Sequence, residues 1–118
     1  MRLPQTVHAA LGLMPQRVLD LGCGTSELAA ALAARGHAVV AVDYARAALA
    51  AAQTRARLRR AALPGPAPPV PLYAVADATA LPFRDAAFDA VLDKGTLDVR
   101  TPLHFCFAPL SDAAFISP

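Results

Sequence analysis

The sequence predicts an α/β fold in which a mostly parallel sheet lies between two layers of helices. Apolar runs of strand length alternate with alanine-rich stretches of helix length, and an acid stands at or near the carboxyl end of four such runs. These acids are Asp20, Asp43, Asp77 and Asp93. In open parallel sheets, ligands bind outside the carboxyl ends of the strands, so we expect the four acids to face one shared site.

The first strand is expected to cover Val18 to Leu21 and to break into a glycine turn at Gly22 and Gly24. Glycine suits a turn beneath a ligand, because it adopts conformations barred to residues with a Cβ and lets backbone N–H groups approach closely. Tight turns between a strand and a helix also use glycine for packing alone. The turn is therefore a candidate binding loop whose strength depends on the residues that follow.

A helix is expected over residues 27–35, with Thr25 or Ser26 as its N-cap and Gly36 just after its end. The next apolar run, AVVAVDY, ends at Asp43 and Tyr44. An acid about 20 residues beyond a glycine turn, at the end of the second strand, is the position from which a carboxylate holds the two hydroxyls of a ribose. Asp43 therefore favours a nucleoside ligand.

A second helix is expected from Ala45 to about Ala62, with arginines near its carboxyl end that complement the helix dipole. The proline-rich residues 63–71 can form neither helix nor inner strand and are expected to act as a stiff connector. A third strand should end at Asp77 and a fourth at Asp93.

Charge indicates which nucleoside is bound. A dinucleotide places its pyrophosphate at the loop and helix N-terminus, and its fingerprint ends with a third glycine where this chain has Glu27. Residues 19–32 contain no lysine or arginine, and Glu27 together with the four strand-end acids would form a negative rim. Such a rim suits a ligand with a sulfonium and an ammonium group and no phosphate, which describes S-adenosylmethionine (SAM).

The chain resembles the class I, seven-strand SAM-dependent methyltransferases in four places: the motif DLGCGTS, the acid Asp43, the pair Asp77-Ala78 and the acid Asp93. The resemblance implies a Rossmann-like methyltransferase sheet, SAM as cofactor and S-adenosylhomocysteine as product. It implies that Asp77 and Ala78 recognise adenine and that Asp93 lies near the methyl group, where it is the candidate catalytic residue. The implied cofactor-binding residues are Asp20, Gly22, Gly24, Asp43, Tyr44, Asp77, Ala78 and Asp93.

The run FDAVLDKGTLD at residues 88–98 is narrower. It resembles the DKGTLD signature of the branch that methylates protein lysines, which includes the citrate synthase-lysine and elongation factor 1A-lysine methyltransferases. The resemblance implies a protein substrate with an acceptor lysine. The alternatives are a non-catalytic fragment that binds SAM or a partner and, as lesser candidates, a small-molecule methyltransferase or an NAD-dependent oxidoreductase.

The expected organisation has three parts: residues 1–17 as the remnant of an N-terminal helix, 18–99 as a SAM-binding domain, and 100–118 as a divergent tail. A complete fold of this kind needs about 200 residues, whereas this chain has 118 and about four strands. The resemblance implies that the third, second, first and fourth strands lie side by side in that order, so the outer edge of the fourth strand, at residues 90–92, lacks the neighbour that a fifth strand would supply. The tail is expected either to pair beside this edge as a short strand through residues 103–107 or to be disordered and leave the edge open and prone to aggregation. The activity of this short form is accordingly in doubt.

Composition favours an intracellular domain. A hydrophobic content of 56% is ample for a core, and a net charge of +2 is too weak to indicate nucleic-acid binding. No apolar run reaches membrane-spanning length, the two cysteines predict no disulfide framework, and three scattered histidines predict no metal site. The first 17 residues hold two arginines and no acid, so the choice between mitochondrial and cytoplasmic location is left open.

Overall fold

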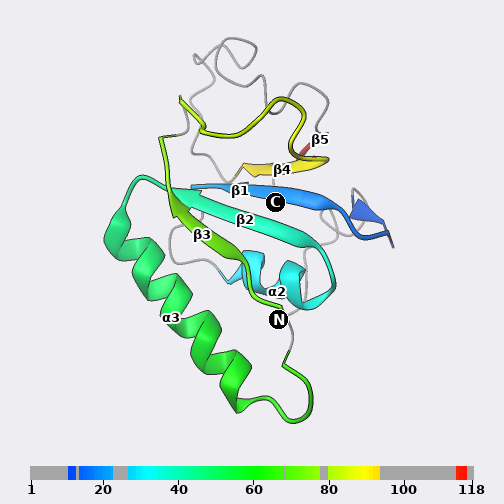
Figure 1. Cartoon of the computed structure of the whole chain (residues 1–118), viewed down its shortest axis with the longest axis vertical. Coiled ribbons are helices and arrows are strands. Elements are labelled where there is room, and N and C mark those ends of the chain that lie inside the picture. Colours follow the sequence, from blue (N-terminus) through cyan, green and yellow to red (C-terminus); the bar gives the residue numbers. More distant parts are fainter. Residues whose placement is uncertain are drawn as a thin grey trace.

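A computed structural model describes residues 11, 12, 14–22, 27–67, 69–77 and 80–93, and the backbone of residues 114–116. The described elements form one parallel sheet with two helices, α2 and α3, against it (Figure 1). In chain order they are β1 (Arg17–Leu21), α2 (Leu28–Ala34), β2 (Ala38–Asp43), α3 (Arg46–Ala62), β3 (Leu72–Val75), β4 (Ala90–Asp93) and β5 (Ala114–Ile116).

The strand order in the sheet is β3-β2-β1-β4-β5. The expected order of the first four strands, with β1 between β2 and β4, is confirmed. Because every pair is parallel, the carboxyl ends of the described strands lie along one edge of the sheet and the amino ends along the other. We call these the carboxyl edge and the amino edge.

The sheet holds one strand more than the four expected. β5 pairs with β4 in the register Ala90↔Ala114, Val91↔Phe115 and Leu92↔Ile116, so the tail pairs beside β4 as a short strand, which was one of the two expected outcomes, but through residues 114–116. The residues proposed to cover it, 103–107, lie outside the described part of the chain. A strand of three residues is too short to be recognised from apolar periodicity, which explains why the sequence did not reveal it.

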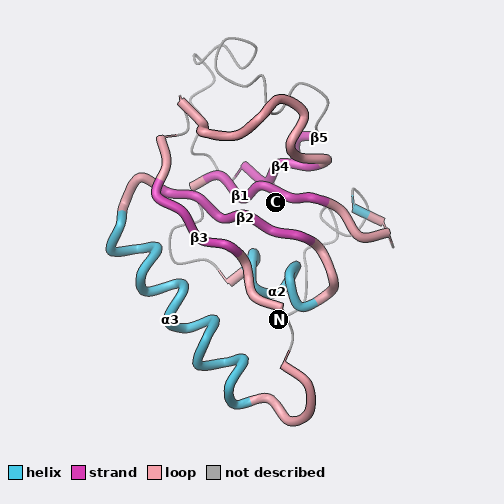
Figure 2. The backbone as a smooth tube through the Cα atoms, viewed as in Figure 1, coloured by secondary structure: helices cyan, strands magenta, loops and turns pink. Residues whose placement is uncertain are grey.

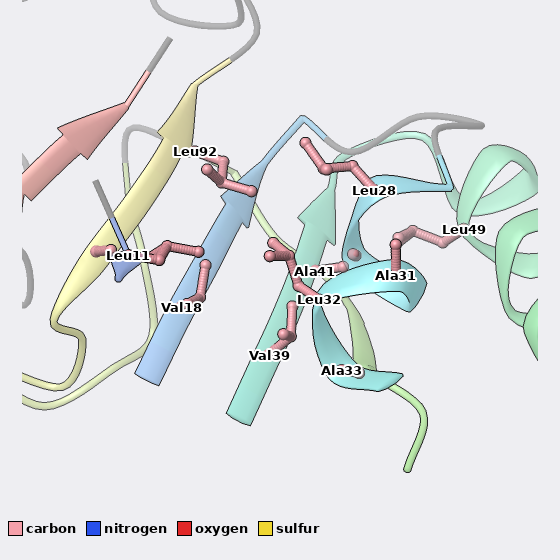
Figure 3. Packing of buried hydrophobic residues seen from close by; sticks show 12 residues of the cluster. Leu11, Val18, Leu28, Ala31, Leu32, Ala33, Val39, Ala41, Leu49 and Leu92 are labelled. Atoms are coloured by element: carbon pink, nitrogen blue, oxygen red, sulfur yellow. The ribbon is translucent and has the colours of Figure 1, made fainter. Parts of the chain in front are cut away.

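One face of the sheet is covered by α2 and α3. Alternate residues of the strands, among them Val18, Val39 and Leu92, pack with leucines and alanines of α2 and with Leu49 of α3. Figure 3 shows Leu28 and Leu32 among these sheet residues. Small alanines on α2 let the helix approach the sheet closely, and burial of this apolar surface is the main stabilising contribution on this face.

The opposite face carries the other alternate residues, because successive side chains of a strand point to opposite sides of the sheet. Leu19, Leu21, Val42, Phe88 and Val91 form a second buried cluster. In the described region the segment between β3 and β4 contributes to this face as loop rather than helix (Figure 2). Its Phe83 ring meets Phe88 edge-on, with centroids 5.0 Å apart.

The helix boundaries differ slightly from the expected ones. α2 begins one residue after its N-cap, Glu27, and no side-chain hydrogen bond caps it. The two residues expected to cap it, Thr25 and Ser26, lie outside the described part of the chain. Gly36 follows the helix with φ +98°, as its glycine predicted. Neither described helix is long and apolar enough to cross a membrane.

Candidate functional site at the carboxyl edge

The carboxyl edge brings together the ends of β1, β2 and β4. In the registers, Leu21 of β1 lies beside Val42 on one side and beside Asp93 on the other, and Asp43 follows Val42 directly. Gly22 then leaves the sheet with φ +63°, a conformation that favours glycine. The structure therefore places Asp43 and Asp93 on the strands either side of the strand that ends in the glycine turn, as the sequence predicted.

Asp20 differs from the other acids because it is fully buried. It stands between Leu19 and Leu21, so strand alternation places its side chain on the face covered by α2. A carboxylate in such a position is costly to bury without polar neighbours, and Asp20 stands two residues before Gly22, near the carboxyl end of β1. Asp20 is thus buried beneath the sheet surface and is not part of an open rim.

Asp43 is half-buried at the end of β2, and both its backbone and its side chain are used in the local structure. Its Oδ1 accepts a hydrogen bond from the backbone N–H of Ala45 at 3.0 Å, just before α3 begins. Its carbonyl accepts one from the N–H of Ala76 at 3.0 Å. The next side chain, Tyr44, is 81% exposed. A carboxylate fixed beside an exposed ring is an arrangement suited to a ribose and its attached base.

Asp93 is the last residue of β4 and is half-buried. Alternation along β4 places it on the face opposite Asp20 and Asp43, since Leu92 packs on the α2 side. Asp77 is exposed beyond the end of β3, and its carbonyl accepts the N–H of Ala80 at 3.0 Å. The acids thus meet at one edge but from two faces of the sheet.

Three of the sequence-based assignments lie outside the described residues: Gly24 of the glycine turn, Ala78 of the adenine pair and the residues of the DKGTLD run after Asp93. The roles proposed for them stay predictions. Within the described part of the chain, no group of three or more His, Cys, Asp or Glu side chains is arranged to hold a metal ion.

Glu27 was expected to add an unpaired negative charge to the rim, but in the structure its carboxylate is paired. Its Oε1 accepts a hydrogen bond from Nη2 of Arg59 at 2.7 Å, which forms an ion pair between α2 and α3. The hydrogen bond from Arg59, and then its charge, hold the pKa of Glu27 below its usual range. The sequence gives no local signal for this pair, because the two residues are 32 positions apart and meet only when the two helices pack together.

A hollow of about 390 Å³ lies at the amino edge and was not predicted. Its lining is mostly apolar, from Val40, Val70, Leu72 and Phe88, with Arg17 and His37 as its basic side chains. The Nδ1 of His37 accepts the backbone N–H of Gln16 at 3.1 Å. Burial, and then the charge of Arg35, lower the pKa of His37.

The carboxyl edge fits SAM better than a phosphate-bearing nucleotide. Its described charged groups at the ends of β1, β2 and β4 are carboxylates, which suit ribose hydroxyls and a cationic ligand. The tight turn at Gly22 leaves the sheet next to them. The chemistry of these groups and the turn therefore agree with the ligand that the sequence predicted.

Comparisons with known proteins support the same conclusion. A family model described as "Methyltransferase domain" matches residues 19–107. A demethylmenaquinone methyltransferase of Thermus thermophilus is 42% identical over 89 residues, which are 74% of this chain and 37% of that protein. A malonyl-[acyl-carrier protein] O-methyltransferase of Geobacter sulfurreducens is 41% identical over 101 residues, which are 84% of this chain and 34% of that protein.

Among solved structures, a SAM-dependent methyltransferase from Methanosarcina mazei superposes with a TM-score of 0.64 and 28% identity, over 79% of this chain and 42% of that one. The chain thus spans little more than a third of the length of the curated relatives it matches. The family match covers β1 from Leu19 onward, all of β2, β3 and β4, and all four of the strand-end acids. The chain belongs to the methyltransferase-domain family of class I SAM-dependent enzymes.

Proposed function

We propose that the carboxyl edge of this chain binds SAM and that the protein transfers the SAM methyl group to a small-molecule or carrier-bound acceptor. The observation that carries the proposal is the register that sets Asp43 and Asp93 on either side of the strand leading into Gly22. Asp43 is assigned to the ribose hydroxyls, because a carboxylate accepts hydrogen bonds from both. Tyr44 is exposed directly beside it.

Asp20, Gly22 and Gly24 are assigned to the turn beneath the methionine portion of SAM, and Asp77 and Ala78 to the adenine. Asp93 is assigned to the methyl end of the site. The cofactor supplies an activated methyl group when it is bound. The contribution of the protein is then mainly alignment, since two reacting atoms held about 3–3.5 Å apart react far faster than in free solution.

The class of acceptor rests on the relatives. Proteins at 41–42% identity are named for methylation of demethylmenaquinone and of a malonyl group on an acyl-carrier protein. A malonyl carboxylate is already ionised near neutral pH and needs only alignment with the methyl group. A quinol must first lose a proton to become a nucleophile, and a carboxylate near the methyl group is suited to accept that proton. Asp93 is the described residue that we assign to this role, as a catalytic residue of the proposed reaction.

A protein lysine is the second candidate acceptor, favoured by the run DKGTLD at residues 93–98. Lysine would have to enter as the neutral amine, and its ordinary pKa of about 10.4 means that desolvation must assist the loss of a proton. The substrates named for the relatives do not support this acceptor. We therefore rank it below the small-molecule acceptor.

A transfer assay separates these possibilities. The chain is incubated with methyl-labelled SAM and, in parallel, with a demethylated quinol, a malonyl-carrier protein, citrate synthase and elongation factor 1A. The proposal expects label on the quinol or the malonyl group and none on the two proteins. Label on a lysine instead would reverse the ranking. Measurable SAM binding without label on any acceptor would favour the non-catalytic alternative, and the absence of SAM binding would refute the cofactor assignment.

A further inference from the structure

The ion pair between Glu27 and Arg59 joins the start of α2 to the last turns of α3. Nη2 of Arg59 donates to Oε1 of Glu27 at 2.7 Å, and the two residues are 32 positions apart in the sequence. Alanines line the narrow crevice beneath the pair, from both helices, together with Tyr73 of β3. The pair therefore ties the start of α2 to the last turns of α3 across this crevice.

Glu27 is also the point at which α2 begins. Its carbonyl accepts the N–H of Ala31 at 3.0 Å, which is the first helical hydrogen bond, and Leu28 and Ala29 behind it are buried. Four residues separate it from Gly22, the first residue after β1. The candidate cofactor loop is thus held between two ends: the sheet fixes the first, and the start of α2 fixes the second.

The start of α2 has little local support. The helix has seven residues, no side-chain hydrogen bond at its N-cap and no acid in its first turn. Short helices are marginal on their own, so their position depends on contacts with the rest of the protein. The side chain of Glu27 accepts a hydrogen bond from Arg59, and this bond connects the start of α2 to α3.

We propose that Arg59 is a positioning residue for the cofactor loop: by holding Glu27, it fixes where the loop re-enters the fold. The inference rests on the proposed function, that SAM binds at this edge. Arg59 need not touch the ligand, because a binding site depends on the residues that hold its first contacts in place. The same pairing neutralises a carboxylate next to the loop.

Stability and affinity should respond differently. The side chains of Arg59 and Glu27 are 49% and 40% exposed, and exposed ion pairs contribute little to stability, so Arg59→Ala should lower the Tm by less than about 4 °C. The affinity for SAM should fall by about 3- to 10-fold, a typical size for coupling between residues in contact. A residue that served only the packing of α3 would lower the Tm without this loss.

The test measures the Kd for SAM by calorimetry, and the Tm, for the whole chain. Arg59→Ala and Glu27→Ala should each weaken binding, and the double variant should be no weaker than either single one. Arg59→Lys and the exchanged pair E27R/R59E should recover most of the affinity. Arg57→Ala, which removes an exposed arginine of the same helix, is the matched control and should bind as the wild type does.

Different results refute different claims. If one of Arg59→Ala and Glu27→Ala weakened SAM binding and the other strengthened it, the charge of Glu27 rather than its position would control the affinity. That result would overturn the inference. An unchanged Kd in Arg59→Ala would overturn it as well, while binding by the wild type leaves the proposed function standing. If the wild-type chain itself does not bind SAM, the proposed function fails and the inference falls with it.

Discussion

The two edges of the sheet are built in different ways. At the amino edge, residues distant in the sequence are tied together: Arg17 and Asp89 are 72 positions apart and share several hydrogen bonds, and Gln16 bonds to His37. At the carboxyl edge, acids end the strands and the side chain of Tyr44 is 81% exposed. The difference teaches that the amino edge stabilises the fold, whereas the carboxyl edge presents groups suited to a ligand.

The Arg17–Asp89 contact shows how closely the amino edge is held. The Oδ2 of Asp89 accepts the backbone N–H of Arg17 at 2.9 Å and its side-chain Nε at 3.1 Å, while Oδ1 accepts Nη2 at 2.8 Å. In return, the N–H of Asp89 donates to the carbonyl of Arg17 at 2.8 Å. These bonds join the starts of β1 and β4, so they fix the register that carries Asp93 to its place at the opposite edge.

The largest effect is expected from Phe88→Ala. Phe88 is 6% exposed in the second core cluster, next to the amino edge, and truncation of a buried phenylalanine costs about 3–5 kcal/mol of unfolding free energy. Urea denaturation measures the loss. Leu72→Ala, at the same edge but 64% exposed, is the control and should change stability by no more than about 0.5 kcal/mol. If the folded fraction of Phe88→Ala also bound SAM more weakly, the separation of the two edges would be refuted.

A smaller effect, on affinity, is expected from Asp43→Ala at the carboxyl edge. Loss of a charged hydrogen-bond acceptor should weaken SAM binding by about 1.5–3 kcal/mol, or roughly 10- to 150-fold in Kd by calorimetry. Asp43→Asn keeps an oxygen that can accept the hydrogen bond from the N–H of Ala45. This variant therefore tests the loss of the charge without the loss of the local hydrogen bond. Asp85→Ala, an exposed acid before β4, is the control. Unchanged affinity in Asp43→Ala would remove the ribose assignment.

The smallest effect concerns pH. The hydrogen bond from the Arg17 side chain, and then the one from its backbone, lower the pKa of Asp89 from 3.8 to about 2. The pKa of Asp89 is lower in the folded state than in the unfolded state, so its ionised carboxylate stabilises the fold. This contribution to the unfolding free energy is fully present above about pH 4 and is lost as the pH falls towards 2. The urea midpoints of wild type and Asp89→Asn should therefore converge over that range. A constant difference would show that the charge of Asp89 does not stabilise the amino edge.

Most of the fold could be predicted because its signals are local. The buried parallel strands read as short apolar runs, the two helices as alanine-rich stretches, and Gly22 and Gly36 mark the turns with positive φ. Strand order and the positions of Asp43 and Asp93 then followed from the family resemblance.

What escaped prediction depends on contacts between distant residues. The pairs Arg17–Asp89 and Glu27–Arg59 arise only when separate elements pack, and the three residues of β5 carry too little pattern to be seen. The acceptor is a related case: a run of six residues, 93–98, favoured a lysine, whereas the relatives at 41–42% identity are named for other substrates. A run of six residues is a narrower basis for naming an acceptor than similarity over 89–101 residues.

The central position of β1 also has a consequence for the order of folding. On one side β1 pairs with β2, which follows after a single helix, and on the other with β4, which follows only after α3, the proline-rich connector and β3. Closing the longer loop costs more entropy and makes non-local pairing slow. We therefore expect β1, β2 and β3 to assemble first and β4 to pair with the remaining edge of β1 afterwards. The Arg17–Asp89 contact would then form only when β4 joins β1, after the first three strands have assembled.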